Sequence, residues 1–543
     1  MDPGPRYLLP FVPDRLPTLR WPVVVIGGGL AGGAAALEAA RSGVDVLQLQ
    51  KAPTDGSNTA WAQGGIAASI GPEDSSEIHA EDTLAVGCGL SEPEAVRAIV
   101  AEGPEAVRWL EALGVDFDRR DEGGMRAGLE GGHSRPRVLS SGGASTGLAI
   151  QTAVDRGLDL EARITRRSDL MAVDLLCHGG RCIGLLALER DGSLLQVLAS
   201  HVVLATGASG QIYRETTNPS VATGDGVAMA WRAGAELQDL EFFQFHPTTL
   251  YIAGAARVLI SEAVRGAGAR LVDRLGRRVM EGVHPDLDLA PRDVVSRAIL
   301  ARMVETGDTH VYLDASGIDA ERRFPSIAAM CRAFGLELDR DPIPVRPGAH
   351  YQIGGVLTDM DGRTTLDGLL ATGEVASTGL HGGNRLASNS LLEALVLGRR
   401  AGRLAAGGAP LPGFSKLARL DDRPGVAVSR PASEPRLNLD DMLYSLKSMM
   451  WRQAGLVREA FPLADAVEKI TFWERVLISR PEASSKWVEL ANMLCVSRLL
   501  ARSALQREES RGTHHRADFP DRDDRSWRRH SRARRSPAEV VPA

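Results

Sequence analysis

The sequence predicts an α/β protein in which a nucleotide-binding domain is interrupted by an inserted α+β domain and followed by a helical domain. Three observations support this fold class. A glycine-rich turn joins two short apolar strands near residue 27. The tripeptide Ala-Thr-Gly ends an apolar strand twice, at 205–207 and at 371–373. From Leu437 to Arg507, apolar residues recur with helical spacing and β-branched runs are almost absent.

The first observation predicts a βαβ unit of the Rossmann type. A strand, a helix and a second strand are predicted at 23–26, 34–41 and 44–49. Between the first strand and the helix lies G-x-G-x-x-G, whose glycines permit a tight turn, close approach of a pyrophosphate and close packing of the helix. The residues expected around the pyrophosphate are Gly27, Gly28, Gly29, Leu30, Ala31 and Gly32.

The end of the second strand departs from the usual pattern. An acidic residue there commonly binds the ribose hydroxyls of NAD, but this chain has Gln50 and Lys51. Either the ribose is bound differently or the nucleotide is not NAD.

The Ala-Thr-Gly repeat predicts that the chain leaves the nucleotide-binding sheet and returns to it. Residues 20–238 and 352–425 are expected to form the two parts of that domain, and 239–351 the inserted one. The first 20 residues look like a loose leader, and helices are expected within 75–115 and near 146–157. Residues 410–435 are rich in proline and glycine, which is typical of a linker. The helical domain is expected at 430–520, and the polar, basic stretch 521–543 is expected to be disordered.

Composition excludes several classes of function. The net charge of −6 argues against a general nucleic-acid surface. No apolar run approaches the ~18 residues of a membrane helix, and the start of the chain lacks the basic and apolar regions of a signal peptide. The five cysteines form no CxxC pair or cluster with histidine, so we expect a cytoplasmic protein without a structural metal.

Several longer motifs occur in order along the first 400 residues. They are NTAWAQGG (58–65), TTNP (216–219), GDG (224–226), EFFQFHPT (241–248), SEAVRG (261–266), APRDVVSRA (290–298), HYQIGGV (350–356) and HGGNRLASNSL (381–391). In these motifs the chain resembles the flavoprotein family of succinate dehydrogenase, fumarate reductase and L-aspartate oxidase. The resemblance implies FAD as the cofactor, which accounts for the missing acidic residue after the second strand.

The resemblance assigns further cofactor-binding positions. They are Lys51, Asn58, Thr59, Ala60, Trp61, Ala62, Gln63, Gly64, Gly65, Asp225, Glu374, Ser390 and Leu391. Respiratory members of the family attach FAD covalently through a histidine at the position of Asn58. Because an asparagine side chain cannot form that bond, we expect non-covalent FAD.

The substrate site follows from the chemistry of a dicarboxylate. Each carboxylate requires cationic or hydrogen-bonding partners when buried. In the family, the residues that match His246, His350 and Arg385 bind these groups, together with a hydroxyl residue that is usually threonine and is Ser261 here. Any one of these histidines, taken alone, is more simply a structural residue.

The resemblance also implies a proton pathway. Arg292 matches the proton-transferring arginine of the family, although a guanidinium rarely releases a proton. Glu262 and Arg265 match the other members of the pathway and lie three residues apart, on one face if the segment is helical. A structural ion-pair cluster is the alternative.

Glu130 is the position expected to distinguish an amino-acid substrate. It begins an EGGHS motif found in the aspartate-oxidising members, and a carboxylate is the natural partner of an ammonium group. The alternative is a solvated loop glutamate. His133 and Arg135 nearby receive no role from the sequence.

Together these expectations describe oxidation of L-aspartate to iminoaspartate, the first step of de novo NAD biosynthesis. The acceptor is expected to be O2, which forms H2O2, or fumarate, and quinolinate synthase is a suggested partner because iminoaspartate hydrolyses readily. A soluble fumarate reductase or succinate dehydrogenase flavoprotein is the nearest alternative. A redox-silent flavin-binding module is a third.

Overall fold

The structure is a computed structural model and describes residues 4–121, 123–143, 145–254, 258–408 and 437–535. Its largest sheet has seven strands in the order β6-β2-β1-β9-β8-β7, with β16 also paired to β9. These strands are β1 (Thr18–Ile26), β2 (Val46–Leu49), β6 (Ile164–Arg167), β7 (Leu170–His178), β8 (Arg181–Glu189), β9 (Leu194–Leu204) and β16 (Leu369–Ala371). The neighbours β6, β2, β1, β9 and β16 pair in parallel, whereas β7, β8 and β9 pair antiparallel.

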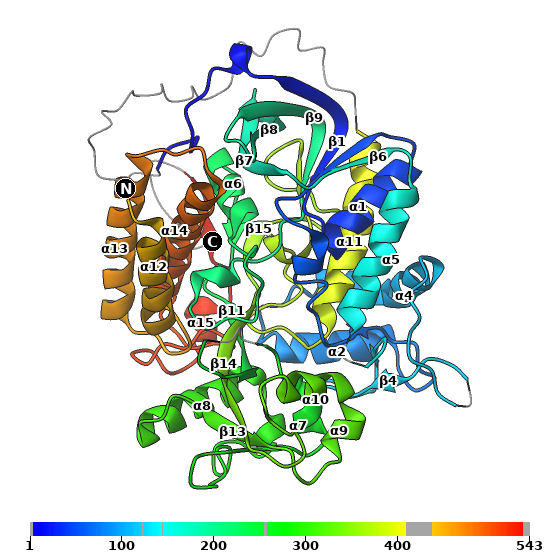
Figure 1. The fold of residues 1–543 in the computed structure, drawn as a ribbon, viewed down its shortest axis with the longest axis vertical. Helices are drawn as coiled ribbons and strands as arrows, with labels where there is room; N and C mark the ends of the chain where they lie inside the picture. Colours follow the sequence, from blue (N-terminus) through cyan, green and yellow to red (C-terminus); the bar gives the residue numbers. More distant parts are fainter. Residues whose placement is uncertain (1–3, 122, 144, 255–257, 409–436, 536–543) are drawn as a thin grey trace.

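The predicted βαβ unit forms the centre of this sheet. Helix α1 (Leu30–Arg41) follows β1 and packs between α5 (Thr146–Leu160) and α11 (Asn389–Ala406) (Figure 1). The crossing of α1 with α11 is close because a Cβ on Gly402 would lie 2.3 Å from the carbonyl oxygen of Ala35. This close packing brings the beginning of α11 to the glycine-rich turn.

The two Ala-Thr-Gly strands lie side by side, since Leu369 pairs with Val202 and Ala371 with Leu204. Residues between them build a second sheet, β11-β14-β13-β12. It consists of β11 (Phe243–Leu250), β12 (Arg270–Val272), β13 (Val311–Asp314) and β14 (Ile343–Gln352) and is accompanied by α7 (Glu262–Gly266), α8 (Arg292–Thr306), α9 (Ala320–Arg323) and α10 (Pro325–Arg332). This sheet has a hydrophobic core of its own that includes Leu271, Ile299 and Leu313. We therefore propose 239–351 as the inserted unit.

Smaller elements surround the two sheets. They are α2 (Ser76–Val86), α3 (Pro93–Ala101), α4 (Gly103–Ala112), α6 (Asp225–Ala233), the sheet of β3 (Ile66–Ala67), β5 (Val138–Leu139) and β4 (Ala127–Gly128), the sheet of β17 (Ala376–Ser377), β15 (Gly355–Leu357), β10 (Leu237–Gln238) and β18 (Arg532–Ala533), and the 3-10 helices η1 (Pro13–Arg15), η2 (Thr54–Gly56), η3 (Gly210–Ile212), η4 (Leu287–Leu289) and η5 (Gly373–Val375). Within the described ranges, no helix is long and apolar enough to cross a membrane.

The periodic segment near the C-terminus forms three long helices, α12 (Leu439–Gln453), α13 (Ala460–Ile478) and α14 (Ser485–Gln506). Figure 1 shows them side by side, next to the large sheet. Their core includes Met450, Leu463 and Leu494. The proposed linker at 410–435 lies outside the described residues.

The expectation of a loose leader is wrong for the described residues from Gly4 onward. Tyr7, Leu9 and Phe11 are buried in the same core as the C-terminal helices. The backbone N–H of Leu8 donates to the carboxylate of Asp174 at 2.7 Å. The sequence did not reveal this docking, because the segment has the proline-rich composition of a loop. Its partner Asp174 also lies more than 160 positions away along the chain.

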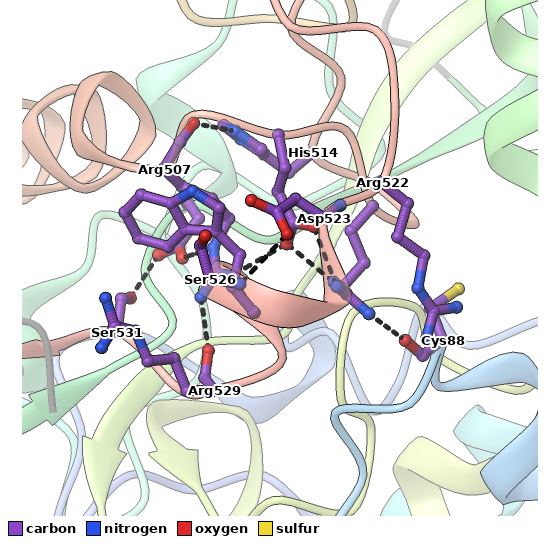
Figure 2. A network of polar contacts seen from close by, with 12 residues as sticks. Cys88, Arg507, His514, Arg522, Asp523, Ser526, Arg529 and Ser531 are labelled. Atoms are coloured by element: carbon purple, nitrogen blue, oxygen red, sulfur yellow. Dashed lines mark hydrogen bonds and ion pairs between the residues drawn. The ribbon is translucent and has the colours of Figure 1, made fainter.

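The expectation of a disordered tail also differs from the structure over residues 521–535, while 536–543 lie outside the described residues. Strand β18 pairs with β10, and α15 (Asp524–Trp527) precedes it. The buried Arg507 side chain donates to the carbonyl oxygen of Trp527 at 2.9 Å. It also donates to the carbonyl oxygen of Arg529 at 2.8 Å (Figure 2). Arg507 is itself paired with the buried Glu241 at 2.6 Å. The tail is ordered because its polar groups have partners elsewhere in the fold.

His530 is expected to make the attachment of this tail depend on pH. Burial lowers its pKa, but the carboxylates of Asp239 at 2.5 Å and Glu92 at 3.0 Å outweigh burial and raise the pKa to about 9. Because the pKa is higher in the folded state, the stabilisation is complete below the unfolded pKa of ~6.5 and is lost as pH rises through about 9. His530→Gln should lower the free energy of unfolding by ~2 kcal/mol at pH 6 and by little at pH 10. Denaturant titrations at both pH values test this, and an equal loss at both would contradict it.

Candidate active site

One cavity of about 580 Å³ extends from the glycine-rich turn to a cluster of histidines and arginines. Most of the residues that the sequence nominated line it. They are Gly27–Ala31, Lys51, Asn58–Gly65, Glu130, Asp225, His246, Ser261, Glu262, Arg292, His350, Glu374, Arg385, Ser390 and Leu391. Gly32 and Arg265 do not line the cavity and lie behind its wall.

The glycine-rich end of the cavity has no room for side chains. Gly27 has a φ of +126°, and a Cβ there would lie 2.0 Å from the carbonyl oxygen of Ala205. A Cβ on Gly32 would lie 2.2 Å from the carbonyl oxygen of Gly27, so this glycine allows α1 to pack against the turn. The backbone N–H of Leu30, at the start of α1, donates to Thr59 Oγ1 at 3.1 Å. Because Leu30 and Ala31, the first residues of α1, line the cavity, the helix N-terminus faces it as a binding site for an anion.

Lys51 also lines the cavity and is held by several polar side chains. Its Nζ contacts the carboxylates of Asp225 at 2.7 Å and Glu489 at 2.6 Å, and Thr223 Oγ1 at 2.6 Å. Burial lowers the pKa of Lys51, but the two carboxylates outweigh it and raise the pKa above its usual value. Glu489 lies on α14, so a C-terminal helix holds the Lys51 side chain without lining the cavity itself. The sequence analysis did not nominate this residue.

At the other end, β11 and β14 place His246 and His350 side by side, with ring centroids 5.3 Å apart. Burial lowers the pKa of both rings well below 6.5, and the neighbouring Arg292 and Arg385 add to the shift. Both rings are therefore neutral. His246 Nδ1 accepts a hydrogen bond from the backbone N–H of Thr248 at 3.2 Å, which leaves Nε2 as the nitrogen that carries a proton.

Arg385 is buried and supplies the positive charge of this cluster. Its guanidinium stacks over the ring of Tyr351, 4.7 Å from the centroid, and Nη1 donates to Ser390 Oγ at 3.1 Å. Burial lowers the pKa of Arg385 to about 10, so the group remains a cation at neutral pH. Ser261, which caps α7, accepts from the N–H of Ala263 at 3.3 Å and keeps its own proton for another acceptor.

Gln244 connects the two arginines of the site, and sequence reasoning missed it. Its Oε1 accepts from Arg292 Nη1 at 3.3 Å and from Arg385 Nε at 3.2 Å, while Nε2 donates to Asn384 Oδ1 at 2.9 Å. The side chain is fully buried. A signal was present, because Gln244 lies two residues before His246 on one strand, where alternate residues share a face.

Arg292, Glu262 and Arg265 form a chain that leads away from the cavity. Arg292 Nε donates to Glu262 Oε2 at 2.6 Å, and Arg265 Nη2 lies 3.8 Å from the same oxygen. Burial raises the pKa of Glu262, but the two arginines outweigh it and hold the pKa at about 2. Arg265 is buried behind Glu262, and burial lowers its pKa. The segment from Glu262 to Gly266 is helical, which places Glu262 and Arg265 on one face.

Glu130 lines the same cavity as the two histidines. Its Oε2 accepts from Ser388 Oγ at 2.8 Å, and the carboxylate remains partly exposed to the cavity. Burial raises the pKa of Glu130, the nearby Arg292 lowers it, and the Glu262 carboxylate raises it further. A cationic group beside Glu130 would stabilise the charged carboxylate and offset much of the free-energy cost of burying it. The pocket therefore has a cationic region for carboxylates and a carboxylate suited to a cation.

Comparison with known proteins identifies the family of this chain. The chain matches the FAD binding domain family over residues 22–391 and the fumarate reductase flavoprotein C-terminal family over 444–541. It is 45% identical to an L-aspartate oxidase of Streptomyces coelicolor, over 96% of this chain and 92% of the relative. It is 46% identical to an L-aspartate oxidase of Mycobacterium tuberculosis (strain H37Rv), over 92% of each chain. The chain belongs to the L-aspartate oxidase family.

Solved structures similar to this L-aspartate oxidase family member include respiratory enzymes. A mutant of Escherichia coli quinol fumarate reductase matches with 30% identity and a TM-score of 0.86, over 96% of this chain and 95% of that chain. Mycobacterium smegmatis Sdh1 in complex with UQ1 matches with 33% identity and a TM-score of 0.82, over 97% and 94%. These likenesses agree with the predicted fold: a mixed α/β flavoprotein with a helical C-terminal region.

The cofactor of this L-aspartate oxidase family member is FAD. Four buried side-chain atoms without a hydrogen-bond partner fit this cofactor: Gln50 Oε1, Gln63 Oε1, Thr206 Oγ1 and Thr372 Oγ1. All four residues line the cavity, together with the side-chain-free turn at Gly27. A large polar molecule with hydroxyl and phosphate groups would satisfy such atoms, because a buried polar atom without a partner costs free energy.

Proposed function

We propose that the chain oxidises L-aspartate to iminoaspartate, as its curated relatives' names indicate. The observation that carries this proposal is the position of Glu130 in the same cavity as Arg385 and the paired histidines. A dicarboxylate with no amino group has no use for a carboxylate at that point. An α-amino dicarboxylate does, because its ammonium needs a partner of opposite charge when it leaves water.

In the proposed complex, the carboxylates of L-aspartate bind to Arg385, His246, His350 and Ser261. Arg385 supplies the charge, and the neutral histidines and the hydroxyl donate hydrogen bonds. Glu130 accepts from the ammonium. Binding at both ends holds C2 in one orientation, which is a large part of what a protein contributes to such a reaction.

Oxidation of the C–N bond removes a hydride from C2 and a proton from the ammonium nitrogen, which leaves the protonated imine. When bound, FAD would supply the acceptor for this hydride, and O2 (giving H2O2) or fumarate would be the final electron acceptor. We assign this proton to a relay in which Arg292, a cation throughout, takes it up only as it passes one of its own protons to the Glu262 carboxylate, with Arg265 as the next member. Glu262, at 2.6 Å from Arg292, holds the guanidinium in place at the cavity wall.

We also propose quinolinate synthase as the partner that consumes iminoaspartate, because this imine hydrolyses readily in water. A cytoplasmic location is part of the same proposal. It is supported by the five cysteines, all of which are free thiols, as expected in a reducing compartment.

The proposal is tested by mixing the purified, FAD-loaded protein with L-aspartate and, separately, with succinate in the absence of oxygen. Loss of the flavin absorbance band near ~450 nm reports reduction. We expect L-aspartate and not succinate to bleach the band, with colour and H2O2 returning on aeration. Bleaching by succinate alone would indicate a respiratory-type dehydrogenase. No bleaching by either substrate would indicate a redox-silent flavin-binding module.

We expect FAD to dissociate when the protein is denatured. Asn58, which stands where a covalent histidine would be required, donates from Nδ2 to Glu374 Oε2 at 3.3 Å. Acid precipitation should therefore release all of the flavin into the supernatant, and none should remain on the polypeptide in mass spectrometry. Flavin retained on the protein would contradict the proposal.

A further inference from the structure

His133 belongs to the EGGHS motif but does not line the cavity. It is buried, with 8% of its surface exposed, and lies behind Glu130. The segment from Glu130 to His133 packs closely against Glu262 and Leu386. A Cβ on Gly131 would lie 2.2 Å from Glu262 Oε1, and one on Gly132 would lie 2.8 Å from Leu386 Cδ1. His133 is therefore placed where it can act on Glu130 and on the loop that follows Arg385.

The protonation of His133 follows from its two partners. Nδ1 lies 2.9 Å from Arg137 Nη1, and Nε2 lies 2.9 Å from the carbonyl oxygen of Ala387. A guanidinium can only donate, so Nδ1 must accept and carries no proton. A carbonyl can only accept, so Nε2 must donate. The ring is neutral and has a single tautomer.

The guanidinium of Arg137 is itself held firmly. It is fully buried and forms two hydrogen bonds of 2.9 Å with the carboxylate of Asp74, and it also donates to Asp82. These carboxylates keep Arg137 charged and oriented toward His133. Burial, together with the charge of Arg137, lowers the pKa of His133 to about 4, which agrees with the neutral ring required by the geometry.

The carbonyl that His133 holds belongs to the residue before Ser388. Ser388 has a φ of +62°, a left-handed conformation that costs a non-glycine residue free energy and needs support from its surroundings. In this conformation Ser388 Oγ donates to Glu130 Oε2 at 2.8 Å. Glu130 and His133, three residues apart, thus contact two consecutive residues of the loop. The carbonyl oxygen of Ser388 also accepts from the backbone N–H of Ala67 at 3.1 Å, so loss of the contact at Ala387 would loosen Ser388 and weaken its contact with Glu130 without unfolding the loop.

Arg385 is held by other groups. It contacts Gln244, Ser390 and the ring of Tyr351, none of which contacts His133 in the described structure. A change at His133 is therefore expected to affect the Glu130 side of the site and to spare the carboxylate-binding side.

We propose that His133 is a positioning residue that, through Ala387 and Ser388, fixes the Glu130 carboxylate for recognition of the substrate ammonium. This assignment rests on the proposed function, because it requires a substrate with an ammonium group. His133 does not touch the substrate, so its replacement should change the preference for L-aspartate over dicarboxylates that lack the ammonium.

The test compares His133→Leu and His133→Gln with the wild-type holoenzyme. Two quantities are measured: kcat/KM for L-aspartate, and the Kd of succinate from the absorbance change of the bound flavin without turnover. For His133→Leu we expect kcat/KM to fall ~30-fold, chiefly through KM, while the Kd of succinate changes less than ~3-fold. His133→Gln, whose amide can accept from Arg137 and donate to Ala387, should recover to within ~5-fold of wild type.

His79→Leu is the matched control. His79 is fully buried beside His133, with ring centroids 6.0 Å apart, but it contacts the side chain of Asn389 at 2.8 Å and not the backbone of the loop. The His79→Leu variant should therefore leave the preference for L-aspartate over succinate unchanged. If His133→Leu does not fold, His133→Gln still tests the assignment, and Ser388→Ala tests the last contact of the series, because it removes the hydrogen bond to Glu130 and leaves the buried histidine intact.

The assignment of His133 would be overturned if His133→Leu lowered kcat/KM for L-aspartate and the affinity for succinate by the same factor. It would also be overturned if neither quantity changed. A wild-type enzyme that does not oxidise L-aspartate would overturn the proposed function and this assignment together. Wild-type activity with an unchanged preference for L-aspartate over succinate in the variants would overturn this assignment alone.

Discussion

Replacing Arg292 by lysine is expected to slow reduction of the bound flavin by L-aspartate by ~10³-fold, because proton transfer by a positioned group contributes ~10²–10⁴ to such rates. Lysine keeps the charge but loses the planar fork that contacts Glu262 Oε2 at 2.6 Å and Gln244 Oε1 at 3.3 Å. Anaerobic stopped-flow mixing measures the rate. The Kd of succinate should change by less than ~5-fold, since Arg385 still supplies the main carboxylate contact.

Arg297→Lys is the control for this experiment. Arg297 lies on the same helix, pairs with Asp293 at 3.0 Å and does not line the cavity. Its replacement should leave the reduction rate within ~3-fold of wild type, as expected for a partly exposed ion pair. Comparable losses in both variants would indicate a structural ion-pair cluster and not a relay.

Glu130→Gln is expected to lower kcat/KM for L-aspartate by ~10²–10³, because loss of one partner of a desolvated charge pair costs ~2–5 kcal/mol. Glutamine keeps the shape and can still accept from Ser388 Oγ, so the loop around 388 should remain in place. Binding of succinate should be unchanged or tighter, since a negative charge beside the dicarboxylate has been removed.

Steady-state kinetics with L-aspartate and flavin absorbance titrations with succinate measure the two effects. A parallel loss with both ligands would show that Glu130 supports the cavity and does not recognise the ammonium. The alternative of a fumarate reductase or succinate dehydrogenase flavoprotein would then gain support.

The sequence by itself predicted the fold class and the chemistry of the cavity. G-x-G-x-x-G between two apolar strands predicted the βαβ unit, and the structure forms it from β1, α1 and β2. The second Ala-Thr-Gly strand predicted a return to the same sheet, and β16 pairs with β9. Each of these motifs is only a few residues long, and within such a motif backbone sterics and strand or helix periodicity act directly.

Contacts between distant segments were not predictable in this way. Gln244 joins Arg292 and Arg385 across separations of 48 and 141 positions. The basic tail, read as disordered from its composition, is ordered through 535 because Arg507 and Glu241 supply partners within the fold. The composition of a segment indicates how much apolar surface it can bury by itself. It does not indicate which buried polar groups elsewhere in the fold can form hydrogen bonds with the segment.

The sequence therefore determined the predicted fold class, the cofactor and the kinds of side chain at the site. Only the tertiary structure decided how those side chains act on each other. It placed Glu130 against Ser388, 258 positions away, and His133 against Ala387, 254 positions away. The physical reason is that hydrogen bonds extend about 3 Å and depend on direction, so they form only where the packing of α1, α11 and the inserted unit brings the partners together.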